Sequence, residues 1–174
     1  MGAQNRLAGW LALDERLSRK LRIAEKPGLL RTLAAFLAHS GDSWFWLLGL
    51  AGLWLLGDEA WKQRALILAV SILVTAVLVM AVKFTIRRKR PEGEWGGMYR
   101  ATDPHSFPSG HAARAFLLAV LGVGLGPGWF GLLLALWAPL VSLARVAMGV
   151  HYLSDVLAGM LVGLAMGGVV LGVV

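Results

Sequence analysis

Residues 111–147 read HAARAFLLAVLGVGL-GPG-WFGLLLALWAPLVSLARVA. Two apolar runs, His111–Leu125 and Trp129–Ala147, flank a glycine-proline-glycine turn. Each run comes close to the roughly 20 residues that a helix needs to cross a bilayer. Such a turn is tight, so the second run should return antiparallel to the first. This pair predicts a membrane-embedded helical protein.

Further apolar runs lie on both sides of this pair, at Ser43–Leu56, Ala65–Val82 and Val156–Val174. They raise the number of candidate crossings to five, and Leu21–His39 would be a sixth if its charges entered the membrane. The composition agrees, because 57% hydrophobic and 16% charged residues leave too little polar surface for a soluble domain of 174 residues. We therefore expect an all-α, polytopic membrane helix bundle with five to six transmembrane helices, forming one domain over residues 1–174.

The N-terminal residues 1–28 have a different character. Between Arg6 and Lys26 apolar and charged positions alternate, and apolar residues such as Trp10 and Leu17 can share one helical face. This pattern is typical of an amphipathic helix that lies in the membrane interface, and Pro27-Gly28 should end it. A solvated basic tail is the alternative interpretation.

Basic residues concentrate in the first 31 residues and in Lys83–Arg100, and the formal net charge is +7. Basic flanks beside apolar spans contact anionic lipid headgroups or set the topology. No nucleic-acid-binding module accompanies them, so we expect membrane lipids and no nucleic acid as partners. Residues 84–110, rich in glycine, proline and cations, are predicted to form an active-site loop. The chain has no cysteine, which excludes thiol catalysis and thiolate metal sites.

Topology should bring two polar regions to one face of the membrane. The loop 84–110 precedes the helix pair of residues 111–147, which crosses and returns, and the polar region around His151 follows it. The two regions should therefore meet. Lys83 would join them from the end of one span. Arg145, in an otherwise apolar run, should join them too, because a guanidinium near the bilayer centre costs about 2.5–3.5 kcal/mol on insertion scales unless it faces a polar cavity.

This combined cluster has the chemistry of a phosphate site. Lys83, Arg90 and Arg145 supply cations, and Lys83 and Arg90 would lie two turns apart if their helix continued to Pro91. Ser109 and His111 lie at a predicted helix N-terminus, a natural anion site, although taken alone they are better explained as a plain N-cap and an interfacial histidine. His151 and Asp155 share a helical face at i,i+4, as many structural pairs do. Carboxylates are scarce here, so we expect neither a metal ion nor another cofactor.

The same residues closely resemble the motifs of the type 2 phosphatidic acid phosphatase superfamily, which also includes the vanadium haloperoxidases. The family's three motifs are matched in order and spacing by Lys83 with Arg90-Pro91, by Pro108-Ser109-Gly110-His111, and by Arg145 with His151 and Asp155. One departure is Ala144, where the family usually has serine before the arginine.

The resemblance implies a role for each residue. His151 would attack phosphorus, Asp155 would orient it, and His111 would protonate the leaving oxygen and then activate water. The phosphoryl oxygens would be held by Lys83, Arg90, Ser109, Gly110 and Arg145. Weaker candidates for contact with the substrate headgroup are Trp95, Tyr99, Arg100, His105 and Arg114, of which Arg114 could instead snorkel to the interface.

We therefore expect a membrane-bound phosphatase that hydrolyses a lipid phosphomonoester or a polyprenyl diphosphate through a phosphohistidine intermediate, without a metal. The main alternative is a non-catalytic membrane transporter or lipid-binding protein, which would not need both histidines and Asp155. A haloperoxidase is a third interpretation, but the haloperoxidases of this superfamily are soluble.

The expected location is a prokaryotic cytoplasmic membrane. With five spans, the N-terminus and the active-site loop share a face, and the positive-inside rule places both in the cytoplasm. With six spans they lie on opposite faces. The resemblance to bacterial family members points to an outward-facing site, so the two indications conflict.

Overall fold

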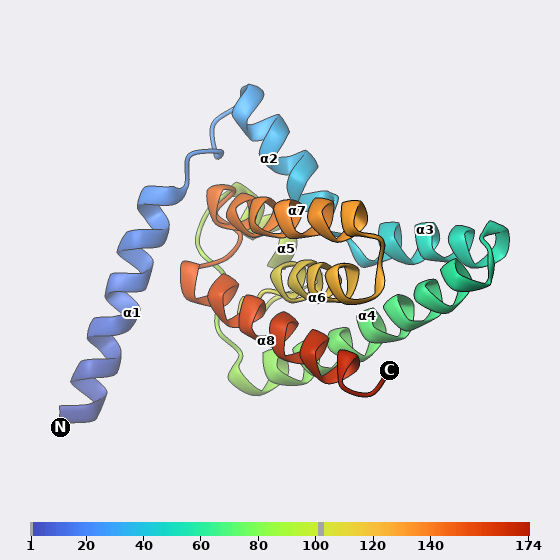
Figure 1. Cartoon of the computed structure of the whole chain (residues 1–174). Coiled ribbons are helices and arrows are strands. Elements are labelled where there is room, and N and C mark those ends of the chain that lie inside the picture. Colours follow the sequence, from blue (N-terminus) through green and yellow to red (C-terminus); the bar gives the residue numbers. More distant parts are fainter. Residues whose placement is uncertain (1, 101–102) are drawn as a thin grey trace.

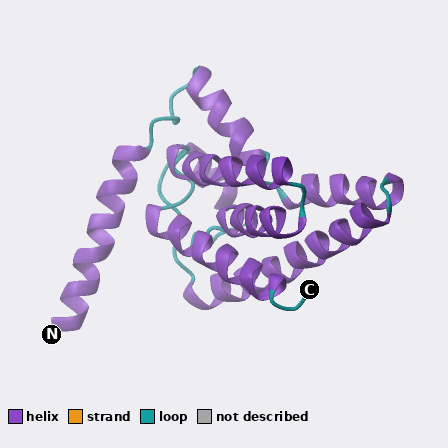
Figure 2. Cartoon of the chain, in the orientation of Figure 1, coloured by secondary structure: helices purple, strands orange, loops and turns teal. Residues whose placement is uncertain are grey.

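The computed structural model describes residues 2–100 and 103–174, without the side chains of residues 2–4, 7 and 100. Within this part the chain is built of helices joined by loops, with no strand (Figures 1 and 2). The helices are α1 Gly2–Leu21, α2 Leu29–His39, α3 Ser43–Leu56, α4 Glu59–Ile86, α5 Glu94–Arg100, α6 Gly110–Leu125, α7 Gly128–Ala147 and α8 Leu153–Leu171. The all-α prediction is confirmed.

Helix α6 forms the centre of the bundle, where α7, α8 and α4 contact it (Figure 1). Its side chains at Ala112, Ala115, Leu117, Leu118 and Leu121 are fully buried. Helix α7 returns antiparallel to α6 through the turn at residues 126–127, as the sequence predicts. The N-terminus of α6 therefore lies at the same end of the bundle as the C-terminus of α7 and the N-terminus of α8.

A glycine stripe holds α8 against α6. A Cβ atom at Gly159 would lie 2.4 Å from the Ser109 carbonyl oxygen, and one at Gly163 would lie 2.2 Å from the Ala113 carbonyl oxygen. Both distances are far below van der Waals contact, so only glycine permits this approach. Small residues at four-residue spacing allow such close helix packing in lipid. The expected structural role of the stripe is confirmed.

Replacing Gly163 with leucine is expected to reduce folded yield severely, because the side chain would collide with the backbone of α6. Gly168 provides the matched control on the same helix, since a Cβ there meets no atom of the described residues within 4 Å. The measurement is detergent-extracted monodisperse protein and its thermal stability. A Gly163→Leu protein with the yield of Gly168→Leu would contradict this packing.

In the described part of the chain, three helices are long and apolar enough to cross a membrane, namely α4, α7 and α8. Helices α2, α3 and α6 are apolar but shorter. Large apolar side chains such as Val77, Leu136 and Leu161 are exposed on the long helices, which suits contact with lipid chains. The membrane-embedded bundle is supported, while five or six crossings stay a prediction.

Three features differ from the sequence-based expectation. Helix α1 ends at Leu21, earlier than Pro27, because the following segment docks on the bundle and the Ala24 amide donates to the Ala147 carbonyl at 3.0 Å. Helix α4 extends beyond the expected span Ala65–Val82 at both ends and stops at Arg87, which adopts a left-handed conformation with φ 53, so Lys83 and Arg90 do not share a helix. The predicted loop 84–110 also contains the short helix α5.

Helix α1 runs across the end of the bundle where α7 stops and α8 starts (Figure 1). Two of its side chains bind the first turn of α8. Ser18 Oγ accepts from the Leu153 amide at 2.8 Å, and Asp14 Oδ1 accepts from the Ser154 amide at 3.0 Å. These bonds satisfy free N–H groups at a helix N-terminus and hold α1 at the polar end of the bundle.

Candidate active site

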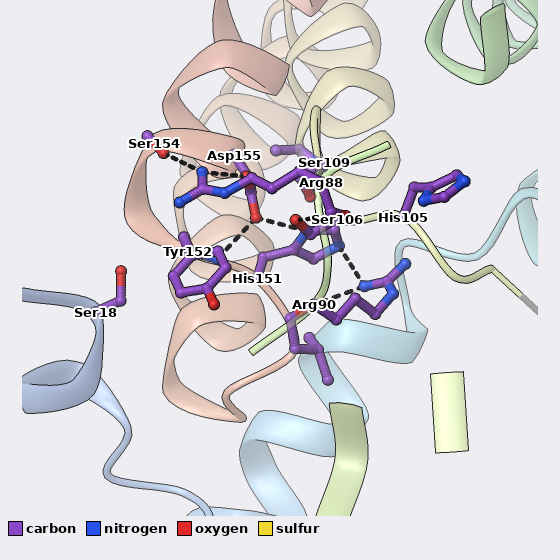
Figure 3. A network of polar contacts seen from close by, with 12 residues as sticks. Ser18, Arg88, Arg90, His105, Ser106, Ser109, His151, Tyr152, Ser154 and Asp155 are labelled. Carbon is purple, nitrogen blue, oxygen red and sulfur yellow. Dashed lines mark hydrogen bonds and ion pairs between the residues drawn. The ribbon is translucent and has the colours of Figure 1, made fainter. Parts of the chain in front are cut away.

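His151 lies in the short connection between α7 and α8, one residue before the α8 N-cap Tyr152. Its side chain is 1% exposed. Its Nε2 atom lies 3.2 Å from Arg90 Nη1. Figure 3 marks this contact with a dashed line. Burial lowers the pKa of His151 well below 6.5, and the charges of Arg90 and Arg145 lower it further. The ring is therefore neutral at pH 7 and retains a lone pair.

Asp155 lies within reach of His151. The i,i+4 argument assumed that both residues belong to one helix, but His151 precedes α8. The distance from His151 Nδ1 to Asp155 Oδ2 is 3.6 Å, and within the described residues Nδ1 has no hydrogen-bond partner. The fully buried Asp155 carboxylate accepts from the Tyr152 amide at 2.9 Å and from Arg88 Nη1 at 2.7 Å. A small movement of the ring would complete the His–Asp pair.

The three predicted cations gather around His151 and are all buried. Arg90 donates through Nη1 to the Val150 carbonyl at 2.9 Å, which ties the loop after α4 to the His151 segment. Lys83 donates to the His105 carbonyl at 3.0 Å. Arg145 is fully buried and donates to the Tyr99 hydroxyl at 3.1 Å, whereas its Nε has no partner among the described residues.

Asp103 connects Lys83 and Arg90 and was not among the predicted site residues. Its carboxylate contacts Lys83 Nζ and accepts from Arg90 Nη2 at 2.7 Å, while its carbonyl accepts from Arg90 Nε at 2.7 Å. Burial would raise the pKa of Asp103, but the hydrogen bond and charge of Lys83, with the charge of Arg90, hold it below its usual value. The two cations thus meet through an anion instead of along one helix.

The N-terminus of α6 completes the cluster. Ser109 is buried, caps α6 by accepting from the Ala112 amide at 3.5 Å, and donates its own amide to the Asp155 carbonyl at 2.9 Å. Gly110 and His111 follow in the first turn, so the helix end with its free N–H groups faces the cations. The side chains of His111, His151, Lys83 and Asp103 line one cavity of about 200 Å³ together with Gly110.

The weaker headgroup candidates are not all brought to this cavity. Tyr99, from α5, lies over Arg145, with the ring centroid 4.6 Å from Cζ. Trp95 packs on a separate buried cluster and stacks under Arg31 at 4.9 Å. His105 contacts Phe84 with ring centroids 5.5 Å apart and points away from His151 (Figure 3).

Two further headgroup candidates have different outcomes. Arg114 lines the cavity and donates to the Gly41 carbonyl inside the protein, so it does not snorkel. The side chain of Arg100 lies outside the described part of the chain.

Arg88 is a second polar residue that sequence reasoning missed. It donates to Asp155 Oδ1 at 2.7 Å, to Ser154 Oγ at 2.6 Å and, with Nη2, to Asp14 Oδ2 at 2.6 Å. Figure 3 shows it between the α8 N-terminus and the site. Its position within a run of four basic residues at 87–90 gave no signal, because the run is most simply interpreted as a solvated or headgroup-binding face.

Comparisons with known proteins agree with this geometry. A model of the PAP2 superfamily matches residues 64–174. The chain is 33% identical over 138 residues to an undecaprenyl-diphosphatase of Sulfolobus acidocaldarius, covering 77% of this chain and 66% of that protein. It is 30% identical over 149 residues to decaprenylphosphoryl-5-phosphoribose phosphatase of Mycobacterium tuberculosis, covering 85% and 82%.

A solved structure extends the likeness to the fold. The crystal structure of a transmembrane PAP2-type phosphatidylglycerolphosphate phosphatase from Bacillus subtilis matches with a TM-score of 0.76 and 25% identity, covering 95% of this chain and 86% of that one. The resemblance inferred from the three motifs is confirmed. The chain therefore belongs to the PAP2 superfamily and is a membrane-embedded phosphatase.

Proposed function

We propose that the protein hydrolyses a lipid phosphate through a phosphohistidine formed on His151. The observation that carries this proposal is a buried, neutral imidazole beside the buried cations Lys83, Arg90 and Arg145 and the N-terminus of α6. Cations and helix N–H groups stabilise the charge that develops on phosphoryl oxygens in the transition state. Because the ring is desolvated and uncharged, Nε2 can act as a nucleophile at neutral pH.

A lipid substrate fits the shape of the cavity. From His111 and His151 it continues along α4, where Ile72, Ala76, Val79 and Met80 line its wall. With the phosphoryl group at the polar end of the cavity, the acyl or prenyl chain would lie against these apolar side chains and extend into the surrounding lipid. The tail would thus approach from the α3–α4 side of α6, opposite to the glycine-packed α8.

The reaction takes two balanced steps. In the first, the Nε2 lone pair of His151 forms the N–P bond, the bond from phosphorus to the lipid oxygen breaks, and His111 donates a proton to that oxygen. In the second, water attacks phosphorus, gives its proton to His111, and the N–P bond breaks to release phosphate. The phosphoryl oxygens would take over the contacts that Arg90 makes with His151 and compete with Asp103 for Lys83 and Arg90.

The relatives suggest which lipids to assay first, since they are named for a polyprenyl diphosphate and a decaprenyl-linked phosphosugar. Purified protein should release phosphate from at least one member of a panel of undecaprenyl diphosphate, a polyprenyl-phosphosugar phosphate, phosphatidylglycerophosphate, phosphatidate and lipid A. Lipid binding or transport without phosphate release from any of them would favour the non-catalytic alternative.

The reaction is expected to be independent of metal ions. The carboxylates near His151, those of Asp103 and Asp155, are already paired with cations, and further positive charge there repels a metal ion. Among the described residues no group of three or more His, Asp or Glu side chains is placed to hold one. EDTA should leave the rate unchanged, whereas vanadate should inhibit at least about 100-fold more tightly than inorganic phosphate, because it mimics the trigonal-bipyramidal transition state. Strong inhibition by EDTA that a divalent ion reverses would contradict the mechanism.

We further expect the N-terminus and the active site to share one membrane face. The contacts of α1 with the first turn of α8 support this arrangement and the interfacial position of α1. Cysteine labelling tests it cleanly, because the chain has no native cysteine. Single cysteines at Gly2 and at the exposed Met98 of α5 should react with an impermeant reagent from the same side. Labelling from opposite sides would support a sixth crossing.

A further inference from the structure

The break between α2 and α3 is held in place by its neighbours on three sides. Trp46 Nε1 donates to the Ser40 carbonyl at 2.9 Å, and Trp137 Nε1 donates to the Ser40 hydroxyl at 2.8 Å. The guanidinium of Arg114, one turn after His111 in α6, donates to the Gly41 carbonyl. Non-helical backbone at membrane depth is stable only when its polar groups are satisfied within the protein. This break therefore has a fixed conformation.

Asp42, the last residue of the break, stands at the N-cap position of α3 but does not cap it in the described structure. Its Oδ1 lies 2.7 Å from His111 Nε2, and its Oδ2 lies 3.2 Å from His39 Nδ1. The next helix shows the ordinary behaviour, since Asp58 at the N-cap of α4 accepts from the Trp61 amide at 2.9 Å. Both carboxylate oxygens of Asp42 thus contact imidazole rings, and neither caps α3.

We propose that Asp42 is a positioning residue that orients His111 and stabilises its protonated form in the first chemical step. This inference rests on the proposed function. Because Nε2–H donates to Asp42, Nδ1 of His111 is the ring nitrogen that transfers the proton. The site then contains two His–Asp pairs with opposite tasks: His151 with Asp155 for attack on phosphorus, and His111 with Asp42 for departure of the lipid oxygen.

The charges around His111 explain why it needs a carboxylate. Burial disfavours a protonated His111 ring most strongly, the charges of Arg145 from α7 and Arg114 from its own helix add to this effect, and Lys83 lines the same cavity. His151 across the cavity is neutral, Asp103 is engaged by two cations, and His39 lies behind Asp42. The direct contact with Asp42 is the one that favours imidazolium.

Asp42 itself stays ionised over any working pH. Burial would raise its pKa, but the hydrogen bond and charge of His111, together with His39, bring it to about 2. The carboxylate can therefore stabilise a proton on His111 in the first step. It can also stabilise the imidazolium that forms again when His111 accepts a proton from water in the second step.

Asp42→Asn tests the inference, because asparagine can still accept from Nε2–H but carries no charge. The rate of phosphoenzyme formation from a lipid phosphomonoester at pH 8 should fall about 10- to 100-fold, with KM changed less than about twofold. The alkaline limb of the pH profile should move about one unit to lower pH. Asp42→Glu should recover part of the rate. Asp58→Asn, which removes the charge from a true N-cap, should leave the rate and the pH profile unchanged.

The leaving group separates a general-acid role from a structural one. With p-nitrophenyl phosphate the departing oxygen needs no proton, so the nitrophenol burst of Asp42→Asn should stay within about threefold of wild type. Equal losses with both substrates and an unshifted pH profile would overturn the inference while leaving the proposed function intact.

A measurement without turnover covers the case in which no substrate is hydrolysed. In protein with ¹⁵N-labelled histidine, the His111 signals are assigned by their loss in His111→Gln. Asp42→Asn should lower the titration midpoint of this ring by about one pH unit. An unchanged midpoint would overturn the inference whatever the enzyme does. An inactive wild type that shows the shift would instead count against the proposed function alone.

Discussion

His151→Ala is expected to lower lipid phosphate hydrolysis by about 10⁴-fold or more, the largest effect of any single substitution in this chain. Removing a nucleophile abolishes both chemical steps, and what remains is the acceleration provided by binding and charge stabilisation alone. The side chain is 1% exposed and comes from a loop, so the protein should still insert and fold. Phosphate release by purified protein, together with its thermal stability, measures both quantities.

The chain offers a matched control for this variant. His105 belongs to the same polar region, but its ring contacts Phe84 and points away from His151 (Figure 3). His105→Gln should retain activity within about tenfold, since it removes an imidazole without touching the reacting atoms. A His151→Ala enzyme that is as active as His105→Gln would show that His151 is not the nucleophile.

Arg145→Ala should have the second-largest effect, about a 10²- to 10³-fold loss in kcat, which is typical for removing one transition-state donor. The residue is fully buried in a membrane helix, and its Nε has no partner in the described structure. A guanidinium placed there at such cost is best explained by an anion that it binds during turnover. The rate of phosphate release at saturating substrate concentration measures kcat.

Arg145→Lys should recover little of this activity, because an ammonium cannot reproduce the planar fork that binds two oxygens. Arg64 supplies the control, since it lies at the far end of the bundle and its Nε donates to the Leu125 carbonyl at 2.7 Å. Arg64→Ala should change stability without lowering kcat by more than about twofold. Full activity in Arg145→Lys would mean that the residue supplies only a point charge or a structural contact.

Much of this arrangement could be predicted from the sequence, for reasons that are physical. Long apolar runs set the helices, and the turn at residues 126–128 brings the regions of Lys83 and His151 to one end. A charge such as Arg145 is costly to bury in lipid, so its place in an apolar run already indicates a functional role. The spacing of the three motifs identifies the family, which the comparisons confirm.

The missed residues depend on contacts that no periodicity encodes. Asp42 looks like an N-cap, and only the position of α6 reveals that its carboxylate faces His111. Asp103 and Arg88 lie in the predicted loop 84–110, whose path depends on the left-handed end of α4 at Arg87. The early end of α1 likewise results from docking on α7, an interaction between segments more than 100 residues apart.

The most direct test of the account is to trap the phosphoenzyme and locate the phosphoryl group. Wild-type protein mixed briefly with ³²P-labelled lipid phosphate and quenched in base should carry label that is stable to alkali and lost in acid, as expected for phosphohistidine. Peptide mapping should place it on His151, with none in His151→Ala, while His111→Ala should still leave His151 as the labelled position. Label on His111, on a serine or aspartate, or turnover without any covalent intermediate would contradict the mechanism.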